Sequence, residues 1–214
     1  MKRGFFITFE GGEGSGKSVQ VEILVRHLTE DGYPIVATRE PGGTRIGTLI
    51  RAITHDSKNS DLRGITEAFL MAADRAQHVR EVIEPGLEMG KIVISDRYVD
   101  SNIAYQGFGR KLGEEFITSL NSFAINNLMP DATFLLNVDV EVGAIRRKNS
   151  TKSDRLDLQR NTFYDSVVKG YAYLAKKNPK RFIIIDANAG IEEVAAVIWR
   201  HVDTLLTTNG IQKS

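Results

Sequence analysis

A glycine-rich stretch near the N-terminus has the residue types and the spacing of a phosphate-binding loop. Residues 11–18 read GGEGSGKS, which fits the pattern G-x-x-x-x-G-K-[ST]. Glycines let backbone N–H groups turn inward around an anion, and the N-terminus of a following helix adds partial positive charge. We therefore expect Lys17 to reach the β and γ phosphates of a nucleotide and Ser18 to hold Mg²⁺. The predicted donor-binding residues of the loop are Gly11, Gly12, Glu13, Gly14, Ser15, Gly16, Lys17 and Ser18.

Both flanks of this loop have the pattern that a phosphate-binding loop requires. The apolar run over residues 5–9 predicts a buried strand. Val21, Leu24, Val25 and Leu28 have the spacing of an amphipathic helix. Strand, glycine loop and helix in this order favour a phosphate cradle over the alternative, a flexible glycine turn between two core elements.

The rest of the chain alternates predicted strands with predicted helices. Four further strands are predicted at residues 34–38, 91–95, 132–138 and 181–186. One long helix has an apolar stripe that we expect to face the core: Ile65, Phe69, Ala72, Ala76, Val79 and Ile83. A closing helix repeats the pattern: Ile191, Val194, Ala195, Ile198, Val202 and Leu205. We predict a single α/β domain over residues 1–214, with a five-stranded parallel sheet, helices on both faces, and ligands beyond the carboxyl ends of the strands.

The composition limits the classes of partner and site. The 28 basic and 27 acidic residues give a net charge of +1, so no global basic field predicts a nucleic acid polymer as partner. The chain has no cysteine, which excludes disulfides and thiolate metal sites, and its four histidines show no ligand spacing. No stretch has the core of a signal peptide or the ~20 apolar residues of a membrane span. We expect a soluble cytoplasmic protein without a membrane partner.

An aspartate and two arginines follow the predicted strands at the edge where ligands should bind. Asp96 comes one residue after a buried strand, where such folds place the carboxylate that holds Mg²⁺ directly or through water. The alternative is a helix N-cap, which does not exclude a metal role. Arg39 and Arg97 leave neighbouring strand ends, and we expect their guanidinium groups to converge on one anion. Either arginine alone would more often form a surface salt bridge.

A third group of cations interrupts the order of strands and helices. Residues 146–157 hold Arg146, Arg147, Lys148, Lys152 and Arg155 within polar sequence rich in serine and lysine. We predict that this segment is a mobile cationic lid, which supplies charge to a transferring phosphoryl group and excludes water. The alternative is a solvated basic surface.

Two anion sites and a lid indicate phosphoryl transfer from a nucleoside triphosphate to a second phosphorylated molecule. A hydroxyl acceptor usually needs a positioned base, whereas a phosphate monoester with a second pKa of about 6 is already an anionic nucleophile near neutral pH. An enzyme that phosphorylates a phosphate can therefore work by alignment and charge neutralisation alone.

Five motifs resemble those of bacterial thymidylate kinases. They are FEG at residues 9–11, TREPGGT at 38–44, Asp74-Arg75, Asp96-Arg97-Tyr98, and SNIAYQG at 101–107. The resemblance implies a three-layer P-loop kinase fold with a short mobile lid. It also implies transfer of the γ-phosphoryl group of ATP to dTMP, giving dTDP and ADP, in nucleotide biosynthesis toward dTTP. Mg²⁺ as cofactor and a homodimer belong to the same expectation.

The resemblance places three charged residues around the phosphate and sugar of dTMP. It puts Arg39 and Arg97 on the dTMP phosphate. It brings Glu10 to the sugar 3′-hydroxyl or to the metal. A carboxylate at position 10 needs such a partner, because the end of a buried strand is a costly place for an unpaired charge.

The thymidine end of the acceptor site is also assigned by the resemblance. Arg75 lies at the thymine edge, Ser101 and Asn102 lie near the base, and Tyr105 lies against the deoxyribose, where its bulk disfavours a ribose 2′-hydroxyl. Family members often have a stacking phenylalanine four residues before this arginine, whereas this chain has Met71. Positions 71 and 75 share a helix face, and methionine can cover a ring. The alternative is that Met71 only fills the core.

The lid departs from the family pattern as well. Similar bacterial enzymes lack an arginine inside the cradle and carry compensating arginines in the lid, and residues 11–18 indeed contain no arginine. We expect Arg147 or Lys148 to meet the γ-phosphoryl group, Arg146 to stack on adenine, and Arg155 to act as a hinge or a phosphate contact. The predicted catalytic residues are Lys17, Asp96, Arg97, Arg147 and Lys148.

Two rival functions have a similar loop. A deoxynucleoside kinase would need a carboxylate base at a 5′-hydroxyl, and two arginines aimed at a phosphate would have no partner. A GTP-binding switch would fit the D-x-x-G of residues 61–64, but no predicted strand precedes it and the chain has no N-K-x-D motif.

Overall fold

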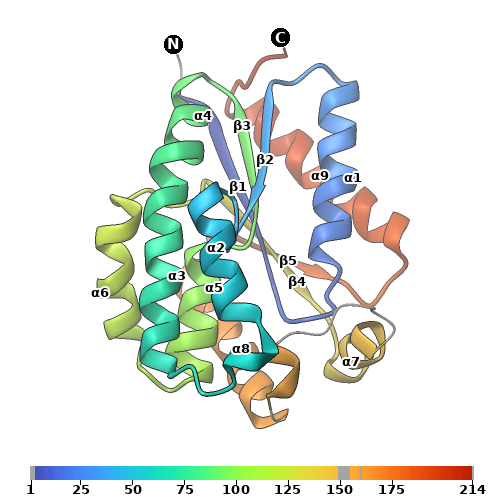
Figure 1. Ribbon diagram of the computed structural model, residues 1–214. Coiled ribbons are helices and arrows are strands. Elements are labelled where there is room, and N and C mark those ends of the chain that lie inside the picture. Colours follow the sequence, from blue (N-terminus) through green and yellow to red (C-terminus); the bar gives the residue numbers. More distant parts are fainter. Residues whose placement is uncertain (1–2, 149–154, 160, 214) are drawn as a thin grey trace.

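The centre of the molecule is a parallel sheet of five strands in the order β2-β3-β1-β4-β5 (Figure 1). The computed structural model describes residues 3–148, 155–159 and 161–213. The strands are β1 (Phe5–Glu10), β2 (Ile35–Arg39), β3 (Ile92–Asp96), β4 (Ala132–Asn137) and β5 (Phe182–Asp186). All neighbouring strands pair in parallel. The predicted sheet is confirmed, and each strand begins and ends within one residue of the predicted bounds.

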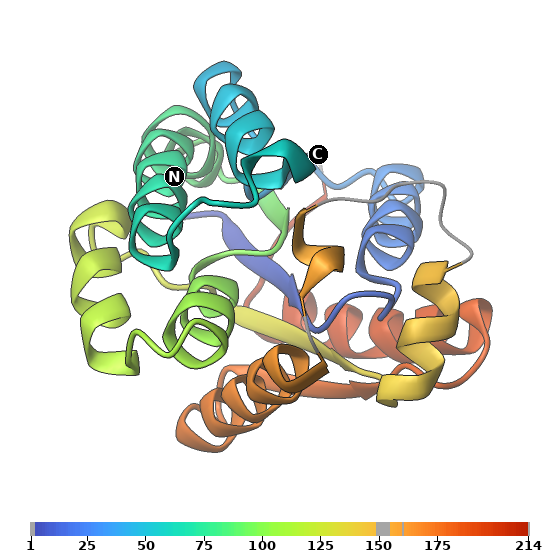
Figure 2. The same ribbon diagram turned by 60° about the horizontal axis from the view of Figure 1, so that its bottom comes forward.

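Helices cover both faces of the sheet (Figures 1 and 2). The long helices in the described parts of the chain are α1 (Lys17–Glu30), α2 (Arg45–His55), α3 (Gly64–His78), α6 (Glu114–Ile125), α7 (Val140–Lys148), α8 (Asn161–Lys177) and α9 (Ile191–Thr208). Shorter helical segments are η1 (Ser57–Asn59), η2 (Val79–Ile83), α4 (Glu84–Glu88), α5 (Val99–Asn102), η3 (Ile103–Gly109) and η4 (Arg155–Leu158). None of the described helices is both long enough and apolar enough to cross a membrane.

Alternating side chains of the central strand build two cores. Phe5, Ile7 and Phe9 are buried against α1 and α9 on one face of the sheet. Phe6 points to the other face and belongs to a core with residues of α3, α6 and α8. Successive side chains of a strand point to opposite faces, so a strand covered on both sides is apolar throughout. This explains the continuous apolar run at the start of the sequence.

The predicted core stripe of α3 is wrong at its N-terminal half. Ile65 and Phe69 are 43% and 54% exposed, whereas Ala72, Val79 and Ile83 are buried as expected. The inward face of α3 holds polar side chains instead: Glu67, Asp74, Arg75 and His78. These buried polar groups hydrogen-bond to other elements, so apolar periodicity alone misjudged which face of the helix turns inward. In α9 the stripe is correct, except that Ile191 is exposed.

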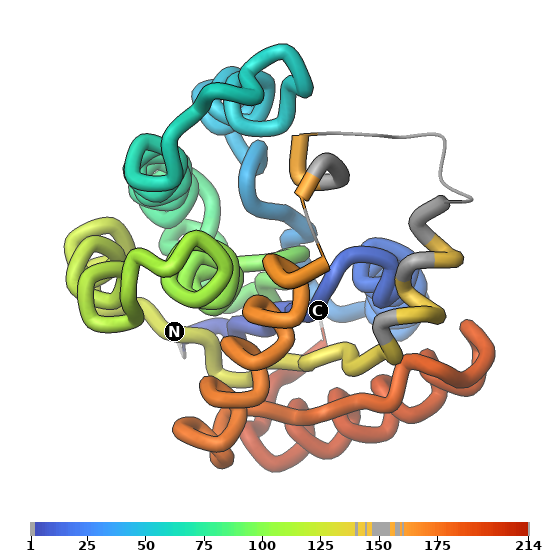
Figure 3. The backbone as a smooth tube through the Cα atoms, turned by 90° about the horizontal axis from the view of Figure 1, so that it is seen from below, coloured from blue at the N-terminus to red at the C-terminus, as the bar shows by residue number. Residues whose placement is uncertain are grey.

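The carboxyl ends of β1, β2 and β3 meet at one edge of the sheet, which Figure 3 shows from below. Phe9 and Arg39 are both register partners of Asp96 in β3. The Arg97 backbone N–H donates to the Phe9 carbonyl at 3.0 Å, so the chain leaving β3 lies against the start of the glycine loop. The loops that carry the candidate site residues therefore converge here.

Candidate active site

The glycine loop follows β1 and turns directly into α1. Gly11 and Gly14 have φ values of 142° and 73°. A Cβ at Gly11 would lie 2.6 Å from the Leu136 carbonyl oxygen, and one at Gly14 would lie 2.2 Å from that of Gly143. Only glycine fits at these two positions. No side chain caps the N-terminus of α1, so its first N–H groups face the loop that the motif assigns to phosphate.

Lys17 is folded back onto the loop that precedes it. Its side chain is buried, and Nζ donates to the carbonyl oxygens of Gly11 at 3.1 Å and Gly12 at 2.8 Å. Burial and the nearby charge of Arg97 lower the pKa of Lys17 to about 8. The ammonium group thus lies within the loop, with its charge held by backbone dipoles.

Ser18 and Asp96 form a pair of oxygen donors beside the loop. The Ser18 hydroxyl donates to Asp96 Oδ2 at 2.5 Å. The other carboxylate oxygen, Oδ1, is buried, and it has no hydrogen-bond partner within the described part of the chain. A hydroxyl and a carboxylate with a spare oxygen suit Mg²⁺, which takes its remaining ligands from phosphates and water. The described residues contain no cluster of three or more His, Asp or Glu side chains that could hold a metal ion without such help.

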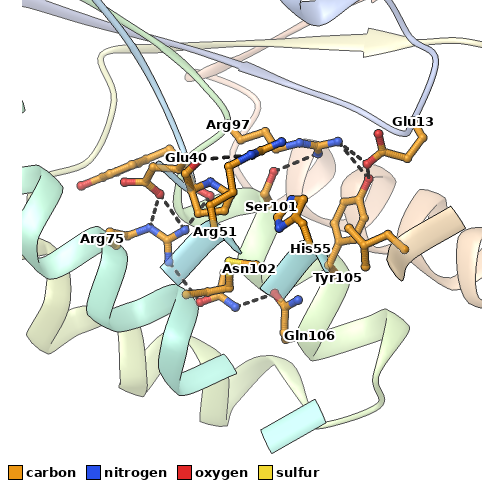
Figure 4. Close-up of a pocket in the computed structure, with 14 residues that line it drawn as sticks. Glu13, Glu40, Arg51, His55, Arg75, Arg97, Ser101, Asn102, Tyr105 and Gln106 are labelled. Carbon is orange, nitrogen blue, oxygen red and sulfur yellow. Dashed lines mark hydrogen bonds and ion pairs between the residues drawn. The ribbon is translucent and has the colours of Figure 1, made fainter. Parts of the chain in front are cut away.

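A pocket of about 100 Å³ lies beside the glycine loop (Figure 4). Its lining includes every predicted acceptor residue except Glu10 and Arg39: Met71, Arg75, Arg97, Ser101, Asn102 and Tyr105. It also includes Glu13, which was predicted for the donor loop, and residues to which the sequence analysis gave no role: Glu40, Arg51, His55, Gln106 and Leu156. Segments that are far apart in the sequence therefore converge on one cavity.

Arg97 connects the glycine loop with this pocket. Its Nη1 donates to the Gly11 carbonyl at 3.1 Å, and its Nη2 donates to Glu13 Oε1 at 2.5 Å and to the Tyr105 hydroxyl at 3.2 Å. The guanidinium also lies over the Tyr105 ring, with 5.0 Å from Cζ to the ring centroid. A single cation thus contacts the glycine loop and also lines the pocket.

Glu13 is one of two carboxylates in the described pocket lining, the other being Glu40. Burial raises the pKa of Glu13, but the charges of Arg97 and Lys17 and the hydrogen bond from Tyr105 outweigh burial and bring the pKa to about 2. An ionised carboxylate with so low a pKa is a poor proton acceptor. The Glu13 carboxylate instead accepts hydrogen bonds from Arg97 and Tyr105 and so fixes the positions of both side chains.

Glu10 ends β1 and lies beneath the pocket lining rather than in it. Its side chain is fully buried, does not line the pocket, and accepts from the Tyr98 backbone N–H at 2.8 Å, the Ser101 hydroxyl at 2.5 Å and the Tyr171 hydroxyl at 2.9 Å. Burial and the charge of Asp100 raise the pKa of Glu10 to about 7. The observed hydrogen bonds of this carboxylate fix the chain that follows β3, and its predicted roles at the 3′-hydroxyl and the metal stay predictions.

Arg39 also lies outside the pocket, because its side chain is exposed at the end of β2. Arg51 of α2 reaches the lining instead, and its Nη1 donates to the Pro41 carbonyl at 3.1 Å. His55 lies one turn further along α2, and burial together with the charge of Arg51 lowers its pKa to about 3. A neutral imidazole beside a guanidinium leaves this end of the pocket suited to an anion. The convergence of Arg39 and Arg97 is therefore not observed.

One part of the pocket wall is a buried polar network around Arg75 (Figure 4). Its Nε donates to Glu40 Oε2 at 2.8 Å, and its Nη1 donates to the side-chain oxygens of Asn102 at 3.0 Å and Asn121 at 2.5 Å. Met71 lines the same cavity one turn before Arg75. Met71 is thus positioned to face a ligand as well as to fill space.

The predicted lid cations fall in different places. Arg146 donates to the carbonyl oxygens of Ala187 at 2.8 Å and Asn188 at 3.4 Å, in the loop after β5. Arg155 is buried on the acceptor side, where it donates to the Thr54 carbonyl at 2.9 Å and to Glu67. Its interactions fit an anchor rather than a contact with the donor phosphates. The side chains of Arg147 and Lys148, and residues 149–154 with Lys152, lie outside the described part of the chain.

Comparisons with known proteins agree on one family. The family model described as thymidylate kinase matches residues 9–198. A thymidylate kinase of Acholeplasma laidlawii is 44% identical over 92% of this chain and 98% of its own, and one of Halothermothrix orenii is 46% identical over 94% and 97%. The crystal structure of thymidylate kinase from Ehrlichia chaffeensis superposes with a TM-score of 0.76 at 34% identity, covering 94% of this chain and 99% of that one.

Proposed function

This chain belongs to the thymidylate kinase family, and we propose that it transfers the γ-phosphoryl group of ATP to dTMP, giving ADP and dTDP in the biosynthesis of dTTP. The observation that carries the proposal is the position of Arg97, which bonds to the glycine loop on one side and lines the acceptor pocket on the other. Phosphoryl transfer requires two phosphates to meet in line, and this guanidinium lies where they would meet.

The acceptor phosphate is expected between Arg97 and Arg51. Two guanidinium groups can bind one phosphate bidentately and neutralise its charge. Both carboxylates among the described lining residues are already engaged, because Glu13 has a pKa of about 2 and is bound by Arg97, and Glu40 is bound by Arg75 and His78. This favours a phosphate acceptor over the 5′-hydroxyl of a deoxynucleoside.

The donor phosphates are expected in the glycine loop. Lys17 would leave the carbonyl oxygens of Gly11 and Gly12 and turn its ammonium group to the β and γ phosphates. Ser18 and Asp96 would hold Mg²⁺, and the unpaired Asp96 Oδ1 supports this role. The ion would offset the negative charge that develops on the phosphates during transfer.

The thymidine part of the acceptor is expected against the buried end of the pocket. Met71 would cover a face of the base, and Arg75, Ser101 and Asn102 would bind its polar edge. Tyr105 would pack against the deoxyribose. Because Tyr105 is fixed by Glu13 and Arg97, its ring cannot easily move aside for a ribose 2′-hydroxyl.

The lid residues complete the proposal. Arg147 or Lys148 would meet the transferring phosphoryl group, and Arg146 would stack on the adenine of ATP. Arg146 already bonds to the loop after β5, at the end of the sheet where the donor base is expected. Arg155 would anchor the segment through Glu67 and Thr54.

A homodimer and a cytoplasmic location are also proposed. Four large apolar side chains of α3 and α6 are exposed: Ile65, Phe69, Phe116 and Phe123. The rings of Phe69 and Phe116 contact each other, with centroids 6.4 Å apart, so the surface spans both helices. Apolar patches of this kind mark association sites, and a second copy of the chain would cover this one.

The cytoplasm is the compartment that holds both proposed substrates.

Coupled ADP release with a panel of nucleoside monophosphates tests the function. We expect dTMP to give the highest kcat/KM, with dUMP next and thymidine inactive. Equal ATP consumption with dTMP and with buffer, or faster phosphorylation of thymidine than of dTMP, would refute the assignment.

A further inference from the structure

Glu67 is a fully buried carboxylate of α3 that joins the acceptor pocket to two arginines. Its Oε2 accepts from Arg110 Nη2 at 3.0 Å and from Arg155. Its Oε1 accepts from the side-chain amide of Gln106 at 2.5 Å. Facing two guanidinium groups, this carboxylate offers the amide only acceptor oxygens.

The amide of Gln106 therefore has a determined orientation. Its Nε2 donates to Glu67, and its Oε1 accepts from Asn102 Nδ2 at 2.6 Å (Figure 4). Reversing the amide would set an oxygen against the carboxylate of Glu67 and a donor against the donor of Asn102. Each of the two contacts would then be repulsive instead of attractive.

Asn102 cannot relieve that conflict by turning its own amide. Its Oδ1 accepts from Arg75 Nη1 at 3.0 Å and from Asn121 Nδ2 at 2.9 Å. Arg75 is a pure donor, so Asn102 must present oxygen to it and nitrogen to Gln106. The chain of hydrogen bonds from Arg75 through Asn102 and Gln106 to Glu67 thus runs in one direction only.

We propose that Glu67 is a positioning residue for base specificity, because it holds the Gln106 amide in the orientation that matches a uracil-type base and opposes cytosine. This rests on the proposed acceptor site. Gln106 and Asn102 both line the pocket, and after its two internal bonds the Gln106 amide retains one N–H and one oxygen lone pair.

The chemistry of the two bases explains why a fixed amide discriminates. Thymine and uracil present a donor at N3 beside an acceptor at O4, whereas cytosine presents an acceptor at N3 beside a donor at N4. An amide that can turn over would satisfy either edge. An amide held in one orientation can satisfy only one of them, and a matched pair of this kind contributes on the order of tenfold to a hundredfold in discrimination.

The test uses dUMP and dCMP as acceptors, because these two differ only at the 4-position and N3 and share the absence of the 5-methyl group. We expect wild-type protein to prefer dUMP in kcat/KM, measured by coupled ADP release at saturating ATP. In Glu67→Gln, residue 67 can offer a donor as well as an acceptor, and we expect the preference to fall about tenfold or more. Glu67→Asp keeps the negative charge for the two arginines, but its shorter side chain no longer reaches Gln106. The same fall in preference is therefore expected for Glu67→Asp, which replaces Glu67→Gln if that variant does not fold.

Glu114→Gln is the matched control, since it makes the same chemical change at an ion pair with Lys177 outside the pocket. Its preference should equal that of the wild type. In a Gln106→Leu background, which lacks the amide, changing Glu67 should no longer alter the preference.

The proposal is overturned if folded Glu67 variants keep the wild-type preference, or if dUMP and dCMP lose kcat/KM equally, as a purely structural role would cause. It is also overturned if the change persists without the Gln106 amide. Failure of the proposed function would look different, because the wild type itself would then show no ADP release that depends on dTMP.

Discussion

Replacing Arg97 by methionine should lower both stability and activity, and the two losses should separate when Glu13 is changed as well. The Arg97 and Glu13 side chains are 17% and 29% exposed, with 2.5 Å between Nη2 and Oε1. Burial raises the pKa of Glu13, but Arg97 and Lys17 bring it from 4.5 to about 2. This shift corresponds to about 3 kcal/mol of stability, which is present above pH 4.5 and is lost as the pH falls toward 2.

In Arg97→Met, Glu13 stays partly buried and loses its main countercharge, so its folded pKa rises. A carboxyl whose folded pKa is raised loses stability as the pH rises through that value. At pH 7 the variant should therefore be less stable by up to about 3 kcal/mol, which is roughly 6–12 °C in Tm for a chain of this length. The deficit should shrink toward pH 4, because protonated Glu13 needs no countercharge. Adding Glu13→Gln should recover most of the stability at pH 7.

Activity should not return with stability. We expect kcat to fall about 10²- to 10³-fold in both the single and the double variant, because a cation at the transferring group is missing. Thermal unfolding between pH 4 and 8, coupled ADP release, and the Kd of ATP are the three measurements. Arg181→Met is the control, since it breaks a similarly buried pair with Asp100, at 2.6 Å, outside the pocket. It should lose stability and keep its kcat within a few-fold.

Two results would refute this reasoning. If the double variant is no more stable than Arg97→Met at pH 7, the buried charge of Glu13 is not the cause of the loss. If ATP affinity falls together with kcat, Arg97 acts mainly on the donor and not at the junction of the two sites.

Lys17→Ala should abolish transfer and leave the folded structure intact by circular dichroism; near-normal turnover would contradict the assignment of the glycine loop. Asp96→Asn should raise the Mg²⁺ concentration for half-maximal activity about tenfold or more, because one charged oxygen is lost, and an unchanged Mg²⁺ titration would remove Asp96 from the metal site. Phe69→Asp together with Phe116→Asp should turn a dimer into a monomer in sedimentation velocity. A wild type that is already monomeric would rule out the dimer.

Local sequence patterns were sufficient to predict those elements of the fold and site that depend on neighbouring residues in the chain. The glycine loop and the five strands follow from apolar periodicity and glycine spacing, and Arg97 follows from its position after a strand. The other predicted lining residues came from the resemblance to a known family: Met71, Arg75, Ser101, Asn102 and Tyr105. Arg51 was missed because it lies inside α2, and nothing in its local sequence shows that this helix lies over the acceptor pocket. Arg39 was predicted because it follows a strand directly, and Arg51 was not considered.

Gln106 and Glu67 were missed for a different reason. Each is a polar residue whose role depends on a hydrogen bond to the other, and the two are 39 residues apart in the sequence. The buried face of α3 carries Glu67, Arg75 and His78, so its polar residues looked like a solvent face and its exposed Phe69 looked like core. A useful signal existed in the chain, because Glu67, Asp74 and Arg75 recur at helical spacing and charged residues on one face call for partners inside the fold.

The backbone at Arg97 explains why a buried Glu10 and a pocket-facing Glu13 are both needed. Arg97 has φ of 73°, a left-handed conformation that costs a non-glycine residue roughly 1–2 kcal/mol. Hydrogen bonds on both sides hold it there, from Arg97 N–H to Phe9 and from Tyr98 N–H to Glu10 Oε1 at 2.8 Å. This turn directs the guanidinium back over the glycine loop, where it donates a hydrogen bond to Glu13. Glu10 therefore fixes the backbone of the turn, and Glu13 fixes the side chain of Arg97.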